Sequence, residues 1–178
     1  FDSVGSTNDV ALEMAREGSP EGTVVTTLSQ TKGRGRRGRQ WVASPGESVI
    51  LSAVLRPKLS IERYQELAFA AAVAVAEMVE TECCLQPKLK WPNDVLVRDR
   101  KLCGILVEHT DGAAVVGIGV NVRQMEFAPE IADTATSIAL EGGTCTDTAK
   151  LTEALAERLF AVYALEFKEI LARWRKYM

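Results

Sequence analysis

The most restrictive feature of this sequence is a long β-prone stretch between residues 89 and 122. It holds four short apolar runs separated by residues typical of turns: 89–91, 95–97, 102–107 and 114–120. Asp111-Gly112 lies between the last two runs, and glycine accepts the positive φ that a two-residue hairpin turn requires. The stretch therefore predicts consecutive hairpins rather than the alternating units of a doubly wound sheet.

The first 60 residues predict one helix and two strands. Residues 6–9 offer several N-cap side chains before apolar residues at helical spacing, and Gly18 provides a stop signal for that helix. Residues 23–28 are β-branched except for Leu28, and residues 48–55 are mostly apolar. We interpret both segments as strands.

Two further helices complete the pattern. The alanine-rich residues 61–81 contain no Gly or Pro and predict one long helix that is largely buried. Thr146 or Asp147 can cap a final helix that runs to about Tyr177. The resulting order predicts an α+β fold around a mixed or mainly antiparallel sheet flanked by helices.

Composition excludes several classes of protein. The 178 residues carry a net charge of −3, with 47% hydrophobic and 25% charged residues, which suits a single globular domain over 1–178. There is no run of about 18 apolar residues, so we expect no transmembrane helix. Phe1 leads directly into polar residues, so we expect no secretory signal and a cytoplasmic protein. The acidic balance argues against binding nucleic acid with the whole surface.

The four cysteines predict neither a disulfide framework nor a metal site. Cys83 and Cys84 are adjacent, and no C-x-x-C pair occurs among these two, Cys103 and Cys145. We expect reduced thiols. His109 is the single histidine, and no set of ligands has the regular spacing of a structural zinc site.

Residues 32–39 are the sharpest local anomaly, with five cations, three glycines and no acid. The glycines can take left-handed φ and aim N–H groups into a concavity. The arginines add planar donors suited to phosphate or carboxylate. Three interpretations stay open, namely an anion-binding active-site loop, a nucleic-acid contact and a solvated basic loop. In each case the dense like charge predicts mobility when no anion is bound.

Three other segments could carry chemistry. In residues 90–94, Pro92 ends a strand and places Asn93 and Asp94 at its edge, where they form either a ligand contact or a plain turn. Lys101 lies at the mouth of an apolar strand, as a site cation or a solvated turn residue. Gly104 within that strand indicates close approach of another group to the backbone. Residues 117–121 alternate glycine with β-branched residues and end on Asn121, a weak signal alone.

Taken together and in order, these segments resemble the biotin protein ligases. The matching pieces are Ser6-Thr7-Asn8, Gln30, residues 33–41, residues 90–94, residues 100–106 and residues 117–121. The basic loop and the Trp-Pro-Asn-Asp block in tandem make the resemblance specific. It implies the class II aminoacyl-tRNA synthetase-like catalytic fold that biotin and lipoate ligases share, in agreement with the α+β prediction.

The resemblance also implies a two-step reaction. Biotin is activated by ATP, with Mg²⁺, to biotinyl-5′-AMP, and is then transferred to a lysine of a biotin carboxyl carrier protein. The basic loop would close over the adenylate and exclude water. Backbone donors and arginines would stabilise the crowded negative charge.

Site residues follow from the resemblance position by position. Those implied in biotin binding are Ser6, Thr7, Asn8, Gln30, Gly33, Arg34, Gly35, Arg36, Lys101 and Gly104. Those implied in nucleotide binding are Arg36, Arg37, Trp41, Asn93, Asp94 and Asn121. The catalytic set is Lys101, Arg34 and Arg36, with Lys101 as a fixed cation rather than a nucleophile, and Trp41 as a packing or lid residue. No residue is implied as a metal ligand.

Two departures from the family pattern define the remaining expectations. The ligase motif begins at Ser6, so within residues 1–178 we expect neither the N-terminal helix-turn-helix that many members carry nor the C-terminal β-barrel that most members carry. We therefore expect no sequence-specific DNA binding and no membrane partner, and leave a homodimer open. The alternatives are a lipoate or octanoate ligase of the same fold, a nucleic-acid-binding module, and a homologue that binds the vitamin without catalysis.

Overall fold

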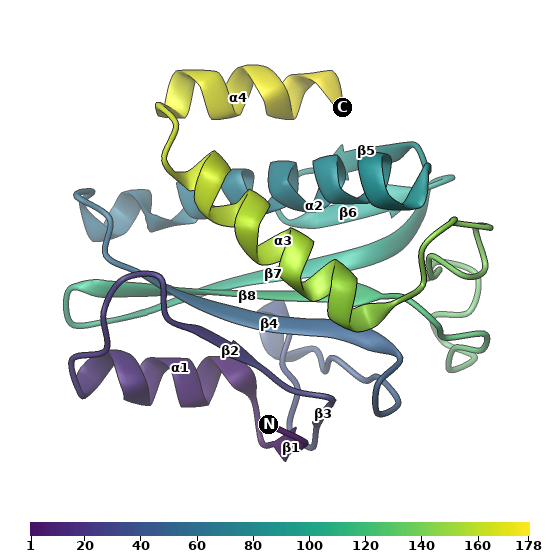
Figure 1. The fold of residues 1–178 in the computed structure, drawn as a ribbon, viewed down its shortest axis with the longest axis horizontal. Coiled ribbons are helices and arrows are strands. Elements are labelled where there is room, and N and C mark those ends of the chain that lie inside the picture. The colour runs from purple at the N-terminus through teal and green to yellow at the C-terminus, as the bar shows by residue number, and fades with distance from the viewer.

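A computed structural model describes all residues, 1–178, and contains one main sheet with helices on both faces and a separate two-stranded pair (Figure 1). The helices are α1 (Thr7–Arg16), α2 (Leu67–Cys83), α3 (Thr148–Tyr163) and α4 (Phe167–Lys176). The strands are β1 (Ser3–Val4), β2 (Val24–Thr26), β3 (Ser29–Gln30), β4 (Ser48–Leu55), β5 (Pro87–Lys90), β6 (Asp94–Val97), β7 (Arg100–Thr110) and β8 (Ala113–Asn121). Short 3-10 turns cover Arg36–Gly38 and Ile61–Glu66.

The main sheet confirms the predicted antiparallel hairpins. Its strand order is β2-β4-β8-β7-β6-β5, and each neighbouring pair is antiparallel. Asp111-Gly112 joins β7 to β8, and Gly112 has the expected positive φ of 68°. The turn from β6 to β7 places Arg98 and Asp99 at φ values of 48° and 62°. Non-glycine residues rarely adopt this left-handed region, so this turn carries some backbone strain.

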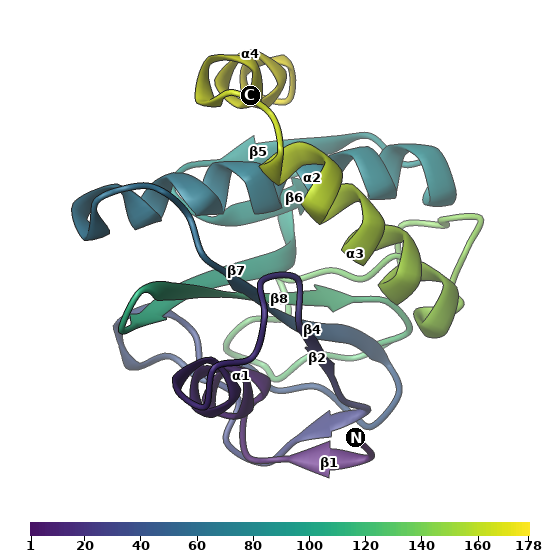
Figure 2. The ribbon, with the colours of Figure 1, turned by 60° about the vertical axis from the view of Figure 1, so that its left-hand side comes forward.

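The centre of the sheet is covered on both faces. All eight residues of β4 are buried, which an alternating strand can achieve only between two layers. On one face, alternate residues such as Leu55 and Val116 join the large core formed with α2 and α3. On the other face, Val54 and Val115 pack against Ala11 and its neighbours in α1. Figure 2 shows α1 and the α2–α3 layer on opposite sides of the sheet.

Two of the predicted helices have different bounds. The helix predicted over 61–81 begins with a 3-10 turn and becomes an α-helix only at Leu67, ending at Cys83. Cys84 then takes the left-handed φ of 55° that glycine usually supplies at a helix end. Helix α2 is almost entirely buried because it lies between the sheet and the outer helices.

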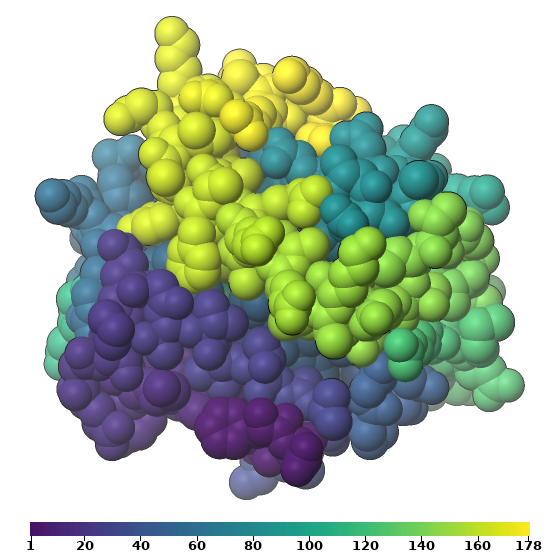
Figure 3. Space-filling view, in the orientation of Figure 1, coloured from purple at the N-terminus to yellow at the C-terminus, as the bar shows by residue number.

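The predicted final helix is in fact two helices. Asp147 caps α3 as expected, because its carboxylate accepts hydrogen bonds from the backbone N–H groups of Ala149 and Lys150. The chain then turns after Tyr163 and α4 packs across α2, where Phe69 contacts the rings of Phe167 and Trp174. No Gly or Pro marks this break, so tertiary packing decides it. Figure 3 shows α3, in green to yellow-green, across the upper part of the visible surface and α4, in yellow, above it.

A short parallel pair, β1 with β3, escaped prediction because each strand has only two residues. It aligns Ser3 with Ser29 and Val4 with Gln30. The pairing holds Gln30 beside the first turn of α1. In addition, none of the helices is both long and apolar enough to span a membrane.

We predict that Cys84 is the fast-reacting thiol of the native chain. It is exposed, whereas Cys83 and Cys103 are buried. Burial raises the pKa of the Cys83 thiol to about 12 and also raises the pKa of Cys103, which disfavours the reactive thiolate in both. Labelling with Ellman's reagent at pH 8 should show a fast phase that Cys84→Ser removes. Peptide mapping that finds Cys103 labelled as fast as Cys84 would contradict the prediction.

Candidate active site

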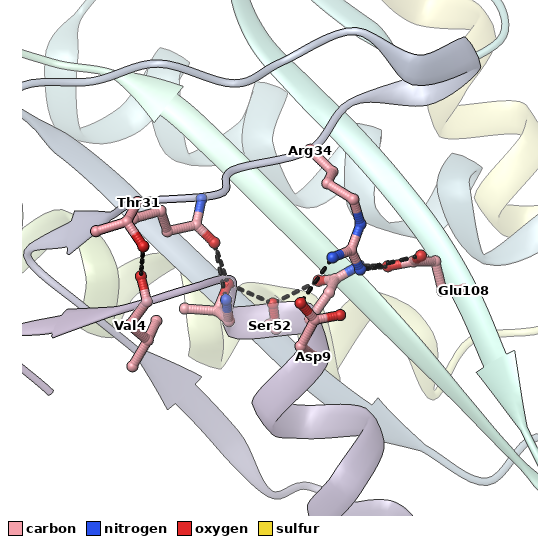
Figure 4. Close-up of polar contacts among 9 residues, drawn as sticks. Val4, Asp9, Thr31, Arg34, Ser52 and Glu108 are labelled. Carbon is pink, nitrogen blue, oxygen red and sulfur yellow. Dashed lines mark hydrogen bonds and ion pairs between the residues drawn. The ribbon is translucent and has the colours of Figure 1, made fainter.

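The site is built around the first turn of α1, where it crosses the sheet. Ser52 of β4 is fully buried, and its Oγ lies 2.7 Å from Thr7 Oγ1 and 2.6 Å from Asn8 Oδ1. Gly117 of β8 lies directly under Asn8, because a Cβ at this glycine would collide with the Asn8 carboxamide. Ser52, which Figure 4 shows beneath the start of α1, and Gly117 thus let this helix approach the backbone of the sheet closely.

Gln30 acts as the cap of α1. Its Oε1 accepts hydrogen bonds from the backbone N–H of Thr7 at 2.8 Å and from Thr7 Oγ1 at 3.1 Å. Ser6 occupies the N-cap position but makes no side-chain capping bond, unlike the usual serine there. Because the oxygen of the Gln30 carboxamide is engaged, its NH₂ group is left to donate elsewhere. Ser6, Thr7 and Gln30 therefore form one polar corner.

Arg34 is held by two carboxylates. Its Nη1 lies 2.7 Å from Asp9 Oδ2 and its Nη2 lies 3.1 Å from Glu108 Oε2 (Figure 4). The hydrogen bond from Arg34 lowers the pKa of the Asp9 carboxyl. Asn8 Nδ2 also donates to Glu108 Oε2 at 2.7 Å. The chain thus supplies its own counter-anions for this part of the basic loop.

A second group of polar side chains gathers at the other end of the site. Lys101 Nζ lies 2.7 Å from Asp94 Oδ1, which is buried and has no hydrogen-bond partner beyond this ion pair. Asn93 Nδ2 donates to the carbonyl of Ile105 at 2.8 Å, and Asn93 Oδ1 accepts from Arg36 Nη1 at 3.2 Å. Arg36, Asn93, Asp94 and Lys101 are therefore brought together as the sequence predicts.

Trp41 lies over a pair of glycines between these two groups. Gly104 of β7 and Gly119 of β8 are register partners. A Cβ at Gly119 would come within 2.5 Å of the Trp41 ring, and one at Gly104 within 3.2 Å. The indole Nε1 is buried without a hydrogen-bond partner. Trp41 is thus a packing residue seated on bare backbone.

Among the three glycines of the basic loop, fewer adopt a left-handed φ than the sequence predicts. Gly38 has φ 73°, but Gly35 has φ −121°, and Arg37 takes the left-handed φ of 56° instead. Gly33 lets the backbone of Trp41 pass close to the loop, since a Cβ at this position would collide with the Trp41 carbonyl. Gly35 closes the turn by donating its N–H to the carbonyl of Arg39 at 2.7 Å.

Asn121 is turned into the protein. It is 5% exposed, its Nδ2 donates to the carbonyl of Thr136 at 2.9 Å, and its Oδ1 accepts from Gln124 at 3.4 Å. Its side chain therefore orders the segment after β8 in this structure. The residues that sequence reasoning missed are Ser52 and Glu108. Ser52 interrupts the apolar residues 49–55 of β4, which is the signal that could have identified it.

No cluster of three or more His, Cys, Asp or Glu side chains suited to a metal ion occurs in the structure.

Comparisons with known proteins agree with the fold. The model of the family described as "Biotin/lipoate A/B protein ligase family" matches residues 1–124. The chain is 38% identical over 149 residues, 80% of its length, to "Bifunctional ligase/repressor BirA" of Bacillus subtilis. It is 39% identical over 163 residues, 88% of its length, to "Biotin--[acetyl-CoA-carboxylase] ligase" of Mycobacterium tuberculosis. These matches cover 46% and 60% of the two relatives, so the chain spans about half their length.

A solved structure is similar over the whole chain. The biotin protein ligase from Aquifex aeolicus in complex with biotin and ATP superposes with a TM-score of 0.88 at 30% identity. The match covers 100% of this chain and 76% of that chain. The α+β catalytic fold expected from the sequence is thereby confirmed.

We predict that Gly119→Ala displaces the Trp41 ring. A methyl group there would meet three ring atoms at 2.5–2.9 Å, closer than real contacts allow. The indole N–H signal of Trp41, identified with Trp41→Phe, should shift in a ¹H–¹⁵N spectrum. Gly5→Ala is the matched control, because nothing lies within 4 Å of a Cβ at Gly5. An unshifted Trp41 signal in Gly119→Ala would contradict the packing.

Proposed function

Since this chain belongs to the biotin/lipoate A/B protein ligase family, we propose that it activates biotin with ATP to biotinyl-5′-AMP and transfers biotin to a lysine of a biotin carboxyl carrier protein. The observation that carries this proposal is the convergence of Arg36, Asn93, Asp94 and Lys101 beside a separate polar corner. The names of the relatives and the substrates of the Aquifex aeolicus structure support it.

The polar corner suits the ureido head group of biotin. That group presents one carbonyl acceptor and two N–H donors. The Ser6 hydroxyl is not used for capping, and the Gln30 NH₂ is available to donate. Asn8 and Arg34 extend this corner toward Glu108, and Gly33 and Gly35 shape the loop around it. The apolar side chain of biotin would then run from this corner past the Trp41 ring toward Lys101.

The first step brings two anions together. A carboxylate oxygen of biotin attacks the α-phosphorus of ATP, the bond to the bridging oxygen of the β-phosphate breaks, and pyrophosphate leaves. Lys101 and Arg36 would stabilise the negative charge that develops between these groups. Lys101 serves as a fixed cation, because the attacking oxygen belongs to the substrate.

The second step transfers the acyl group. The amine nitrogen of the carrier lysine attacks the carbonyl carbon of the mixed anhydride. AMP leaves with the anhydride oxygen, and the amine loses a proton as the amide forms. The basic loop, with Trp41 seated on the sheet, would exclude water that could hydrolyse the adenylate.

Mg²⁺ fits this site as an ion that binds together with the nucleotide and not to the protein alone. Proteins usually hold it with one or two carboxylates together with substrate phosphates. Asp94 is a carboxylate at this end of the site, with a buried oxygen that has no partner besides Lys101. The ion supplies neutralisation of phosphate charge when it is bound. Arg37 and Asn121 are further proposed nucleotide contacts, the latter through the backbone that it orders.

Lipoate or octanoate is the main alternative substrate. Neither has a ureido group, so the donors and acceptors of the polar corner would be left unpaired, which disfavours binding strongly. A pyrophosphate-release assay with biotin, lipoate and octanoate in parallel tests the proposal. Release with biotin alone supports it, whereas release with lipoate or octanoate alone, or with none of the three, overturns it.

Several finer expectations remain proposals. We propose that residues 1–178 form one catalytic domain and that they make no sequence-specific DNA contact. Specific recognition needs an element that reaches base edges in a groove, while basic-loop contacts with phosphate only position a protein. A cytoplasmic location remains a prediction, and the choice between monomer and homodimer stays open.

We predict that Lys101→Ala lowers the rate of biotin-dependent pyrophosphate release about 10²–10³-fold, the typical effect of losing a charge-stabilising group. Lys88→Ala is the matched control, since Lys88 also forms a lysine–aspartate ion pair, with Asp99 at 3.1 Å, on an exposed part of β5. Unchanged turnover in folded Lys101→Ala would remove Lys101 from the catalytic set.

We also predict that the amides of residues 31–39 exchange hydrogen fast in the free protein and slowly with biotin and ATP. The cations of this loop exceed the carboxylates that pair with them, and the adenylate supplies the missing negative charge. Hydrogen–deuterium exchange with mass spectrometry measures this. Equal exchange with and without the two substrates would rule out closure of the loop.

A further inference from the structure

The carboxylate of Glu141 has no part in the chemistry proposed above, yet it is among the most buried charges of the chain. Its side chain is 0% exposed and lies in the segment between β8 and α3. Arg100 Nη2 lies 2.6 Å from Oε1, and Arg98 Nε lies 3.4 Å from Oε2. Thr136 Oγ1 donates a hydrogen bond to Oε1, while Oε2 accepts none.

Burying the Glu141 carboxylate in this way carries a large desolvation free energy. Removing a carboxylate from water costs several kcal/mol, and an ion pair with incomplete hydrogen bonding often recovers less than an apolar side chain would. Arg98 is 76% exposed, so its contribution to the pairing is weakened by solvent. Packing alone therefore does not explain why a carboxylate occupies this position.

Thr136 connects Glu141 to two residues of the proposed site. Its backbone N–H donates to the carbonyl of Lys101 at 2.9 Å, and its carbonyl accepts from Asn121 Nδ2 at 2.9 Å. The N–H of Lys101 in turn donates to the carbonyl of Thr134 at 2.7 Å. Both backbone groups of Lys101 are thus held by the segment that Glu141 anchors.

We propose that Glu141 is a positioning residue for adenylate formation. It ties Thr136 to Arg100 at the start of β7, and thereby fixes the backbone from which Lys101 reaches Asp94. The inference rests on the proposed function only in its kinetic consequence. The polar corner takes its hydrogen bonds from α1, β3, β4 and β7, with none to Glu141 or Thr136. The effect should therefore fall on ATP use and not on biotin recognition.

The first experiment needs no activity. Hydrogen exchange of the Lys101 and Thr136 amides is measured in the wild type, Glu141→Gln, Glu141→Ala and Thr136→Val without substrates. We expect faster exchange at these two amides in Glu141→Ala and Thr136→Val. Glu141→Gln should change exchange less, because its carbonyl oxygen still accepts from Thr136 and Arg100. Exchange equal to the wild type in all three variants overturns the proposal, whether or not the chain makes biotinyl-5′-AMP.

The second experiment measures pyrophosphate release. In Glu141→Ala and Thr136→Val we expect kcat/KM for ATP to fall about 100-fold, the scale of a 1 Å misplacement in a site, with an unchanged KM for biotin. Glu141→Gln should recover part of the loss. A parallel rise in KM for biotin, or unchanged use of ATP, overturns the proposal. Failure of the wild type to release pyrophosphate would count against the proposed function and leave the exchange result to decide the positioning role.

Glu82→Gln is the matched control. Glu82 also pairs with two cations, Lys150 at 3.3 Å and Arg158 at 3.1 Å, but it joins α2 to α3 away from Lys101. We expect this variant to leave amide exchange at Lys101 and the use of ATP at wild-type values. If Glu141→Ala does not fold, Thr136→Val and Glu141→Gln carry both measurements.

Discussion

The site depends on close approach of side chains to bare backbone at the centre of the sheet. Gly117 lies under the Asn8 carboxamide, and the register pair of Gly104 and Gly119 lies under the Trp41 ring. A single methyl group at Gly117 or Gly119 would collide with these side chains. The same strands are packed with valine and isoleucine at neighbouring positions, where they form the core. Strands β7 and β8 therefore bury apolar side chains in the core and expose glycine backbone to the site. Helix α1 and the basic loop both pack against this glycine backbone.

The cationic side chains of the site are paired with polar or acidic side chains of the same chain. Arg34 is held by Asp9 and Glu108, Lys101 by Asp94, and Arg36 by the Asn93 amide. An incoming anion must compete with these partners, which lowers its net gain, but it meets donors that are already oriented. The basic character of residues 32–39 is local to a chain of net charge −3, and it is only partly neutralised, by the two carboxylates of α1 and β7 that pair with Arg34.

Sequence reasoning succeeded where local chemistry decides the structure. The bounds of β4 match the predicted 48–55, and Gly112 has the predicted positive φ. It failed where distant contacts decide, as at the break between α3 and α4, which contacts with Phe69 stabilise without any breaker residue. In the site, the motifs identified Lys101 and Asn93, which carry recognisable patterns. Ser52, Glu108 and Glu141 were missed because their roles arise from partners 44 to 100 residues away or from burial that periodicity does not reveal.

The two ends of the site share β7 but otherwise rest on different parts of the fold. The polar corner rests on α1, β3, β4 and, through Glu108, the second half of β7, whereas Lys101 and Asp94 rest on β6, the start of β7 and the segment before α3. The basic loop contacts both ends, through Arg34 at the corner and Arg36 at Asn93. A ligand that orders the loop at one end therefore reduces the conformational entropy that is lost when a second ligand binds at the other end. Because such coupling is reciprocal, ligands bound at the two ends, which under the proposed function are biotin and ATP, should each strengthen the binding of the other through the loop that contacts both ends.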